Sequence, residues 1–113
     1  MKIINKTGRT IALYINNIWQ TFFPEGSPVI LKESLQPYSS AEVQISKYTY
    51  SGIINLPDKQ QDVIIVVDKD IALKCWQMLR DDVVYMHAPA VRDDKYRSVA
   101  SITLVCWTNA FFS

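Results

Sequence analysis

The residues best suited to chemistry lie in RDDVVYMHAPAVRDD, residues 80–94, where Arg-Asp-Asp occurs twice around the chain's one histidine, His87. Grouped carboxylates can bind a divalent cation or exchange a proton, and an unperturbed histidine titrates near neutral pH. Arginines next to aspartates can instead form salt bridges that hold turns. Which of the two applies depends on the helices and strands that place these side chains.

The aspartates nearest to this stretch favour the structural reading. Asp68, Asp70, Asp81 and Asp82 bracket the two ends of DKDIALKCWQMLRDD, and a helix over this segment separates the two pairs by about 18 Å. Asp68-Lys69-Asp70 resembles the start of a calcium loop, but the glycine and the distal glutamate of such a loop are missing. We expect Asp68 or Asp70 to cap the helix, Asp81 and Asp82 to form salt bridges or turn caps, and no metal or cofactor.

Nothing in the spacing of the nucleophilic residues indicates catalysis. No serine lies in a nucleophile elbow, no glycine-rich loop can hold phosphates, and Cys75 and Cys106 are too far apart for a zinc knuckle. No signal peptide is recognised, so both cysteines are expected to be reduced in a cytoplasmic protein, with a disulfide between them as the alternative. His87 is expected to be packed or on the surface, and the protein is expected not to be an enzyme.

The low net charge argues against nucleic acid as the partner, although several aromatic side chains could stack on bases. The residues that could stack on bases are Trp19, Phe22, Phe23, Tyr48 and Tyr50. The net charge is only +1, and no basic groove accompanies them, so we expect them in the core. The longest apolar runs are far shorter than the roughly 20 residues of a membrane span.

The length of 113 residues predicts a single domain, residues 1–113, with one core. In the first half, MKIIN and IALYI predict a β-hairpin that turns at Thr7-Gly8. Asn16-Asn17 predicts a second turn before a strand over 18–23. Short strands are expected at 29–31 and 41–45, joined by a loop that contains Pro37, and Ser51-Gly52 is expected to turn the chain again.

The second half has a different pattern. VIIVV at 63–67 is typical of a strand buried on both faces. Apolar residues at 71, 75, 78 and 79 predict one amphipathic helix over about 69–80, and further strands are expected at 83–86 and 98–107. The fold class is therefore α+β: an antiparallel, β-rich sheet or partial barrel with a single helix packed on it.

Several segments, taken in order, resemble a family of small proteins of bacteria and their phages. Members begin with a motif like MKIINLTPH and carry Leu-Pro followed by a segment like RDDLxxPxxLVRD. The matching residues here are Met1–Asn5, Pro37–Ser40, Leu56-Pro57, Val63–Val67, Arg80–Val83, Pro89, Val91–Asp93 and Ser98–Leu104. Lys6-Thr7-Gly8 departs from the Leu-Thr-Pro-His motif, and Asp94-Lys95-Tyr96 lacks the usual glycine. The resemblance implies a phage or mobile-element setting, and it transfers no catalytic residue.

We therefore expect a non-enzymatic, cytoplasmic protein-binding module of phage or mobile-element origin, with inhibition of a host or anti-phage defence complex, as by an anti-CRISPR protein, as its activity. The expected contact residues are the charged turn residues Arg80, Asp81, Asp82, Arg92, Asp93 and Asp94. One alternative is a nucleotide- or small-molecule-binding protein, or a minor enzyme, with a pocket near His87. Another is a homo-oligomeric virion or assembly component that associates through the C-terminal TNAFFS.

Overall fold

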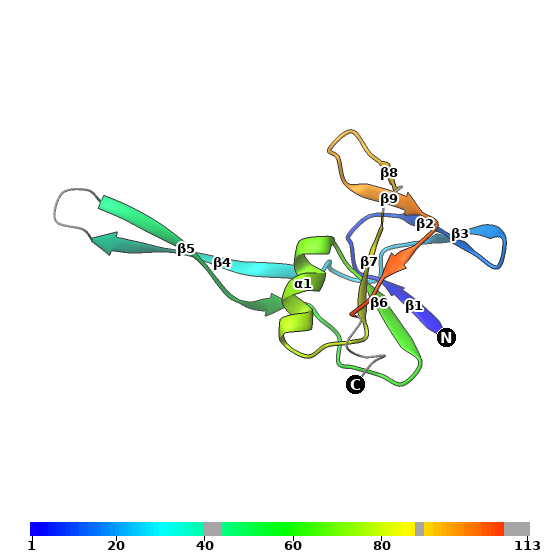
Figure 1. The fold of residues 1–113 in the computed structure, drawn as a ribbon, viewed down its shortest axis with the longest axis horizontal. Helices are drawn as coiled ribbons and strands as arrows, with labels where there is room; N and C mark the ends of the chain where they lie inside the picture. Colours follow the sequence, from blue (N-terminus) through cyan, green and yellow to red (C-terminus); the bar gives the residue numbers. More distant parts are fainter. Residues whose placement is uncertain (40–43, 88–89, 108–113) are drawn as a thin grey trace.

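A computed structural model describes the backbone of residues 1–39, 44–87 and 90–107, and their side chains outside 33–51 and Ala90. Within these ranges the chain forms ten strands and one helix, which confirms the predicted α+β class (Figure 1). The described strands form three sheets, none of which closes into a barrel. Parallel and antiparallel pairs are both present in the two four-stranded sheets, which are therefore mixed, whereas the two-stranded sheet is antiparallel.

The first sheet is built around the apolar run VIIVV. Its strand order is β1 (Lys2–Asn5), β6 (Val63–Val66), β7 (Val83–Met86) and β10 (Leu104–Val105). β6 pairs in parallel with both β1 and β7, and β10 pairs antiparallel with β7. Ile65, Val66 and Val67 are at most 1% exposed. The prediction of a strand buried on both faces is confirmed, because β6 has a neighbour on each side and a packed layer on each face.

Helix α1 (Lys69–Gln77) covers one face of this sheet. Ile71, Ala72 and Cys75 are buried against the sheet, as their spacing predicts. The helix ends three residues before the predicted boundary, because Leu79 adopts a left-handed φ of 62° and the N–H of Arg80 returns to the carbonyl of Cys75. Met78 and Leu79 were expected on the buried stripe and are exposed instead.

The second sheet covers the opposite face of the first, so the body has three layers. Its order is β3 (Ile18–Phe22), β2 (Ile11–Ile15), β9 (Ser98–Ser101) and β8 (Ala90–Arg92). The Asn16-Asn17 turn between β2 and β3 is confirmed, with φ of 53° and 66°. The predicted single strand over 98–107 is two strands, β9 and β10, which lie in different sheets.

The predicted N-terminal hairpin is wrong. β1 pairs with β6, about sixty positions away, and belongs to a different sheet from β2. The reason is the burial of both faces of β1: Ile4 packs toward α1 and Ile3 toward the second sheet. A hairpin with β2 would leave one of these faces without a partner layer.

A long β-hairpin projects from the body and makes the molecule 60 Å long (Figure 1). It consists of β4 (Ile30–Ser39) and β5 (Gln44–Ile54), which pair antiparallel from Ile30↔Ile54 to Ser39↔Gln44. We call it the β4–β5 arm. The expected loop around Pro37 and the turn at Ser51-Gly52 are both wrong, since Pro37 lies inside β4 and residues 51–52 lie inside β5. The contribution of TNAFFS (108–113) falls outside the described residues.

Candidate functional site

The first Arg-Asp-Asp holds the connection between α1 and β7. Arg80 donates from Nε to Oδ1 of Asp82 and from Nη2 to Oδ2, both at 2.9 Å. Nη2 also donates to the carbonyl of Pro57 at 2.7 Å. The Asp82 side chain is 4% exposed and that of Arg80 19%, so this pair is largely buried. The hydrogen bond to Asp82 raises the pKa of Arg80.

Asp81 points elsewhere and pairs with Lys59. The hydrogen bond from Lys59 lowers the pKa of Asp81. The salt-bridge role predicted for Asp81 and Asp82 is confirmed. Neither carboxylate converges with the acidic residues at the start of α1, and no group of three metal-binding side chains occurs in the part of the chain that the structure describes.

The second Arg-Asp-Asp holds the turn between β8 and β9. Oδ1 of Asp93 accepts from the backbone N–H groups of Lys95 at 3.0 Å and Arg97 at 2.8 Å, and Oδ2 accepts from Nε of Arg97 at 2.9 Å. These bonds, the one from the backbone of Arg97 first, lower the pKa of Asp93. Nη1 of Arg92 donates to the carbonyl of Tyr96 and to Oγ of Ser98. The two tripeptides therefore hold two separate turns, and Arg92 and Asp94 are the members whose side chains are most open to solvent.

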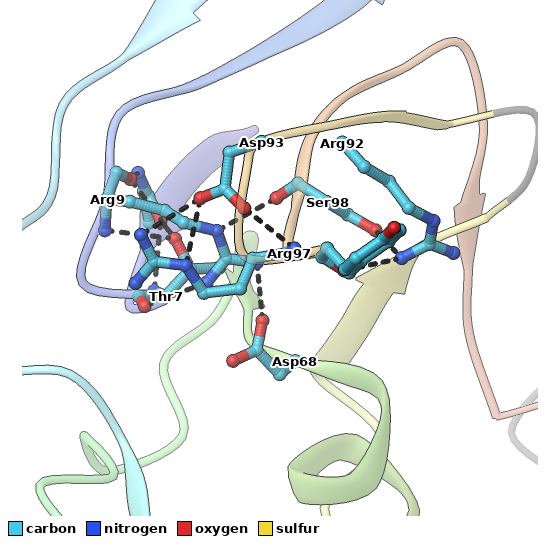
Figure 2. Close-up of polar contacts among 9 residues, drawn as sticks. Thr7, Arg9, Asp68, Arg92, Asp93, Arg97 and Ser98 are labelled. Carbon is cyan, nitrogen blue, oxygen red and sulfur yellow. Dashed lines mark hydrogen bonds and ion pairs between the residues drawn. The ribbon is translucent and has the colours of Figure 1, made fainter.

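Asp68 occupies the N-cap position of α1, but its side chain makes no capping hydrogen bond. The expectation that Asp68 or Asp70 caps the helix through its side chain is therefore wrong for Asp68. Its Oδ1 accepts instead from Nη2 of Arg9 at 2.6 Å (Figure 2). In the bond to Arg9 both donor and acceptor are ionised, whereas in a capping bond from a backbone N–H only the carboxylate is.

Arg9 is held tightly in the loop between β1 and β2. Its side chain is 9% exposed. Besides the bond to Asp68, Nε donates to the carbonyl of Ser98 at 2.9 Å and Nη1 to that of Thr7 at 3.2 Å. The loop itself is held by Asn5, whose Nδ2 donates to the carbonyl of Arg9 at 2.7 Å. Sequence reasoning missed Arg9, because its partners lie 59 and 89 positions away.

A cavity of about 270 Å³ lies beside this network, between the start of α1 and the β8–β9 turn. Its walls carry four cationic side chains and two carboxylates. The lining residues are Arg9, Val67, Asp68, Lys69, Asp70, Met86, Arg92, Tyr96, Arg97 and Ser98. In Figure 2, the side chain of Arg92 lies apart from those of Arg9 and Arg97. The structure thus gathers residues from three distant segments into one cationic hollow.

His87 does not take part in this cavity. It is exposed, its backbone N–H donates to the carbonyl of Thr103, and it is not among the residues that line the cavity. Cys75 is buried and Cys106 half-buried, and both are free thiols. Burial raises the pKa of the Cys75 thiol. The cavity is therefore lined by Met86 and Arg92 but not by His87, the residue near which a small-molecule pocket was expected.

Aromatic side chains on and next to β2 and β3 are open to solvent. Trp19 is 54% exposed and contacts Tyr14 with 5.3 Å between ring centroids, and Phe23 is 71% exposed. The expectation that these aromatics fill the core is wrong for Trp19 and Phe23, whereas Phe22 packs against the core of the second sheet. The side chains of Tyr48 and Tyr50 lie outside the described set.

Comparisons with known proteins add no relatives. No protein-family model, curated protein or solved structure matches the chain. The resemblance to the small bacterial and phage family therefore stays a prediction. Among the described residues, no helix has the length and apolar character needed to cross a membrane.

Proposed function

We propose that this protein is a non-enzymatic protein-binding module that adds a strand of its partner to the β4–β5 arm. The observation that supports this is the arm itself: two strands of ten and eleven residues that project from the body and pair with no other described strand (Figure 1). An isolated two-stranded hairpin is only marginally stable in water, and a third strand stabilises it. Its outer edges carry N–H and C=O groups that can pair with an incoming strand.

The register shows which backbone groups face outward. Pro37 has no N–H, yet it is the register partner of Ser46 in a continuous ladder. In an antiparallel pair, hydrogen-bonded and non-hydrogen-bonded positions alternate, so Pro37 and Ser46 must form a pair whose backbone groups face away from each other. By the same alternation, the backbone N–H and C=O groups of Tyr48 and Tyr50 in β5 and of Leu35 in β4 also face outward.

The edge of β5 is therefore the better template for a new strand. Along β5, the backbone groups of Gln44, Ser46, Tyr48 and Tyr50 face outward without interruption. Along β4, Pro37 removes one donor from the middle of the edge. β5 is also rich in residues that favour strands, with isoleucine, tyrosine and threonine between 45 and 50.

The partner in this proposal is a protein of the host cell cytoplasm, and the consequence of binding is inhibition of a host or anti-phage defence complex. This setting is supported by the resemblance to the phage-associated family, and the binding mode by the arm. The charged turns are a second contact region in the proposal. Arg92 and Asp94 are the best placed of the six residues for it, since Arg80 and Asp82 are committed to an internal pair.

The test uses two matched serine-to-proline substitutions on the two edges of the arm. Ser46→Pro removes an outward N–H from β5, and Ser39→Pro removes one from β4. Both leave the ladder bonds between β4 and β5 intact, because both positions face away from the partner strand. Wild-type protein and both variants are immobilised, a host lysate is passed over them, and the retained proteins are quantified by mass spectrometry.

We expect a retained host protein whose capture falls at least about fivefold with Ser46→Pro and less than about twofold with Ser39→Pro. Amide exchange of Ser46 and Tyr48 slows in the complex, while that of Leu35 does not. Equal losses for both variants refute the strand-addition mode. Capture of nothing but the protein itself, together with an oligomer in light scattering, refutes the host-partner proposal and favours the homo-oligomeric alternative.

A further inference from the structure

The cationic cavity beside α1 has a chemistry that the arm does not use. Its walls carry Arg9, Lys69, Arg92 and Arg97 against the carboxylates of Asp68 and Asp70. Asp93 does not line the cavity but pairs with Arg97, so the excess over the three carboxylates is one positive charge. We propose that this cavity binds the phosphate group of a small phosphate monoester. This binding site does not involve the β4–β5 arm, and it shares Arg92 with the second contact region proposed above.

Arg9 provides a rigid cationic wall. Its side chain is 9% exposed, and three hydrogen bonds, to Asp68, Ser98 and Thr7, fix the guanidinium in one orientation. A charged side chain that is already held in one conformation loses little further conformational entropy when it binds an anion. Asp68 balances the charge of Arg9, so the net attraction must come from the other cations in the cavity.

Arg92 and Arg97 are the groups that can engage the anion. Arg92 donates from Nη1 alone, to the carbonyl of Tyr96 and Oγ of Ser98, so Nε and Nη2 have no partner among the described residues. Arg97 binds Asp93 through Nε and Nη2, which leaves Nη1 without a described partner. Guanidinium groups bind phosphate oxygens through two parallel N–H donors, a geometry that an ammonium group lacks.

The position of the cavity in the fold supports the same ligand. The parallel strands β1, β6 and β7 end on this side of the sheet, and Val67, Asp68 and Met86 at their carboxyl ends line the cavity or its rim. In sheets of this kind, ligands bind outside the carboxyl ends of the strands. The first N–H groups of α1 also lack a side-chain cap, and a helix N-terminus attracts negative charge.

The volume of the cavity and the charges on its wall limit the size of the ligand and the affinity for it. At about 270 Å³, the cavity is smaller than the roughly 300–1,000 Å³ of pockets that enclose drug-sized molecules. It therefore encloses a phosphate group, while the rest of the ligand stays outside. Asp70 on the wall repels anions, so we expect moderate affinity.

Tyr96 lies at the cavity wall and is 84% exposed. A ring in this position can stack on an aromatic group attached to the phosphate, as in a mononucleotide. An ester with an aromatic group is therefore expected to bind more tightly than one without it.

Isothermal titration calorimetry of the full chain tests the proposal. The titrants are inorganic phosphate, ribose 5-phosphate and adenosine 5′-monophosphate, with sodium sulfate and adenosine as comparisons. The variants are Arg92→Gln, which removes the fork and the charge, and Arg92→Lys, which keeps the charge alone. Lys95→Gln is the matched control, because Lys95 lies in the same turn, is exposed and does not line the cavity.

We expect wild-type protein to bind the two esters with millimolar or tighter Kd, and Arg92→Gln to weaken binding about tenfold or more. Arg92→Lys recovers less than half of this loss on a logarithmic scale, and Lys95→Gln changes Kd less than about twofold. Tyr96→Ala weakens binding of the nucleotide and leaves ribose 5-phosphate unchanged. The proposal is overturned if neither ester binds at a ligand concentration of about 10 mM. It is also overturned if adenosine binds as well as its monophosphate, or if Lys95→Gln weakens binding as much as Arg92→Gln.

Discussion

Replacement of Asn5 is expected to destabilise the protein more than its small size suggests. Asn5 is 1% exposed at the end of β1. Its Oδ1 accepts from the backbone N–H of Thr7 at 3.0 Å and from Oγ1 of Thr7 at 2.6 Å. Its Nδ2 donates to the carbonyls of Arg9 at 2.7 Å and Phe22 at 2.9 Å. One amide thus joins the loop that holds Arg9 to the end of β3.

The magnitude follows from these four contacts. A typical hydrogen bond contributes about 1 kcal/mol net, and a buried group left without a partner costs about as much or more. Water that enters the space vacated in Asn5→Ala recovers part of the loss. We expect the free energy of unfolding to fall by about 3 kcal/mol, which corresponds to about 12 °C in Tm for a chain of this length.

Urea unfolding followed by tryptophan fluorescence measures this loss. Two further variants test whether the loss of stability comes from the amide group of Asn5. Asn5→Asp keeps the acceptor toward Thr7 but sets a carboxylate oxygen against the two carbonyls, so at pH 7 it is expected to destabilise more than Asn5→Ala. Asn55→Gly removes one exposed hydrogen bond at a position with φ of 69° that glycine tolerates, and it is expected to cost less than about 1 kcal/mol. A loss below about 1 kcal/mol for Asn5→Ala, or a milder effect of Asn5→Asp, refutes the reasoning.

Three further predictions concern the turns. Asp82→Ala leaves the largely buried Arg80 without its partner and lowers the free energy of unfolding by about 2–3 kcal/mol in urea, whereas Asp81→Ala at the exposed pair costs less than about 1 kcal/mol. The pKa of Asp93 is lowered in the folded state, so its contribution to stability is present above the ordinary value of 3.8 and is lost as the pH falls through the lowered value. The free energy of unfolding in urea is therefore expected to change less between pH 6 and pH 3 for Asp93→Asn than for wild type. Gly8→Ala combines a φ of 82° with a new Cβ only 3.0 Å from a proline side chain, and its Tm falls by several degrees, about 4–8 °C.

Each of these predictions has an outcome that contradicts it. Equal losses for Asp82→Ala and Asp81→Ala contradict the difference in burial. An unchanged pH response in Asp93→Asn contradicts the lowered pKa. For Gly8, the control is Gly26→Ala, where φ is 66° but the nearest atom to the new Cβ is Nζ of Lys6 at 3.4 Å, so a Tm loss as large as that of Gly8→Ala rules out the steric contribution.

Local patterns predicted the strand at 63–67 and the helix that follows it, but not the division of residues 98–107 between two sheets. The β-branched run at 63–67 and the apolar spacing of Ile71, Ala72 and Cys75 correspond to β6 and α1. Such patterns report which faces are buried, and burial of short elements depends mainly on their own residues. The end of α1 was missed, because the left-handed Leu79 is a residue type with no local preference for that conformation.

The first half shows where local patterns fail. Asn16-Asn17 predicted its turn because asparagine tolerates positive φ on its own. Thr7-Gly8 also forms a bend, but the strands on either side of it join different sheets. Pro37 was expected in a loop and lies in a strand, because its missing N–H faces an open edge.

The candidate sites show the same difference between contacts of residues close in the sequence and contacts of distant residues. The assignment of the two Arg-Asp-Asp tripeptides to turns followed from local residues alone, since arginine and aspartate so close together can pair locally, as Arg80 does with Asp82. The pairing of Arg9 with the carboxylate of Asp68, and the position of Arg92 and Arg97 at one cavity, depend instead on how the whole chain folds. These contacts join segments up to 89 positions apart, and the pairing of strands that brings them together depends on the whole core rather than on any local pattern.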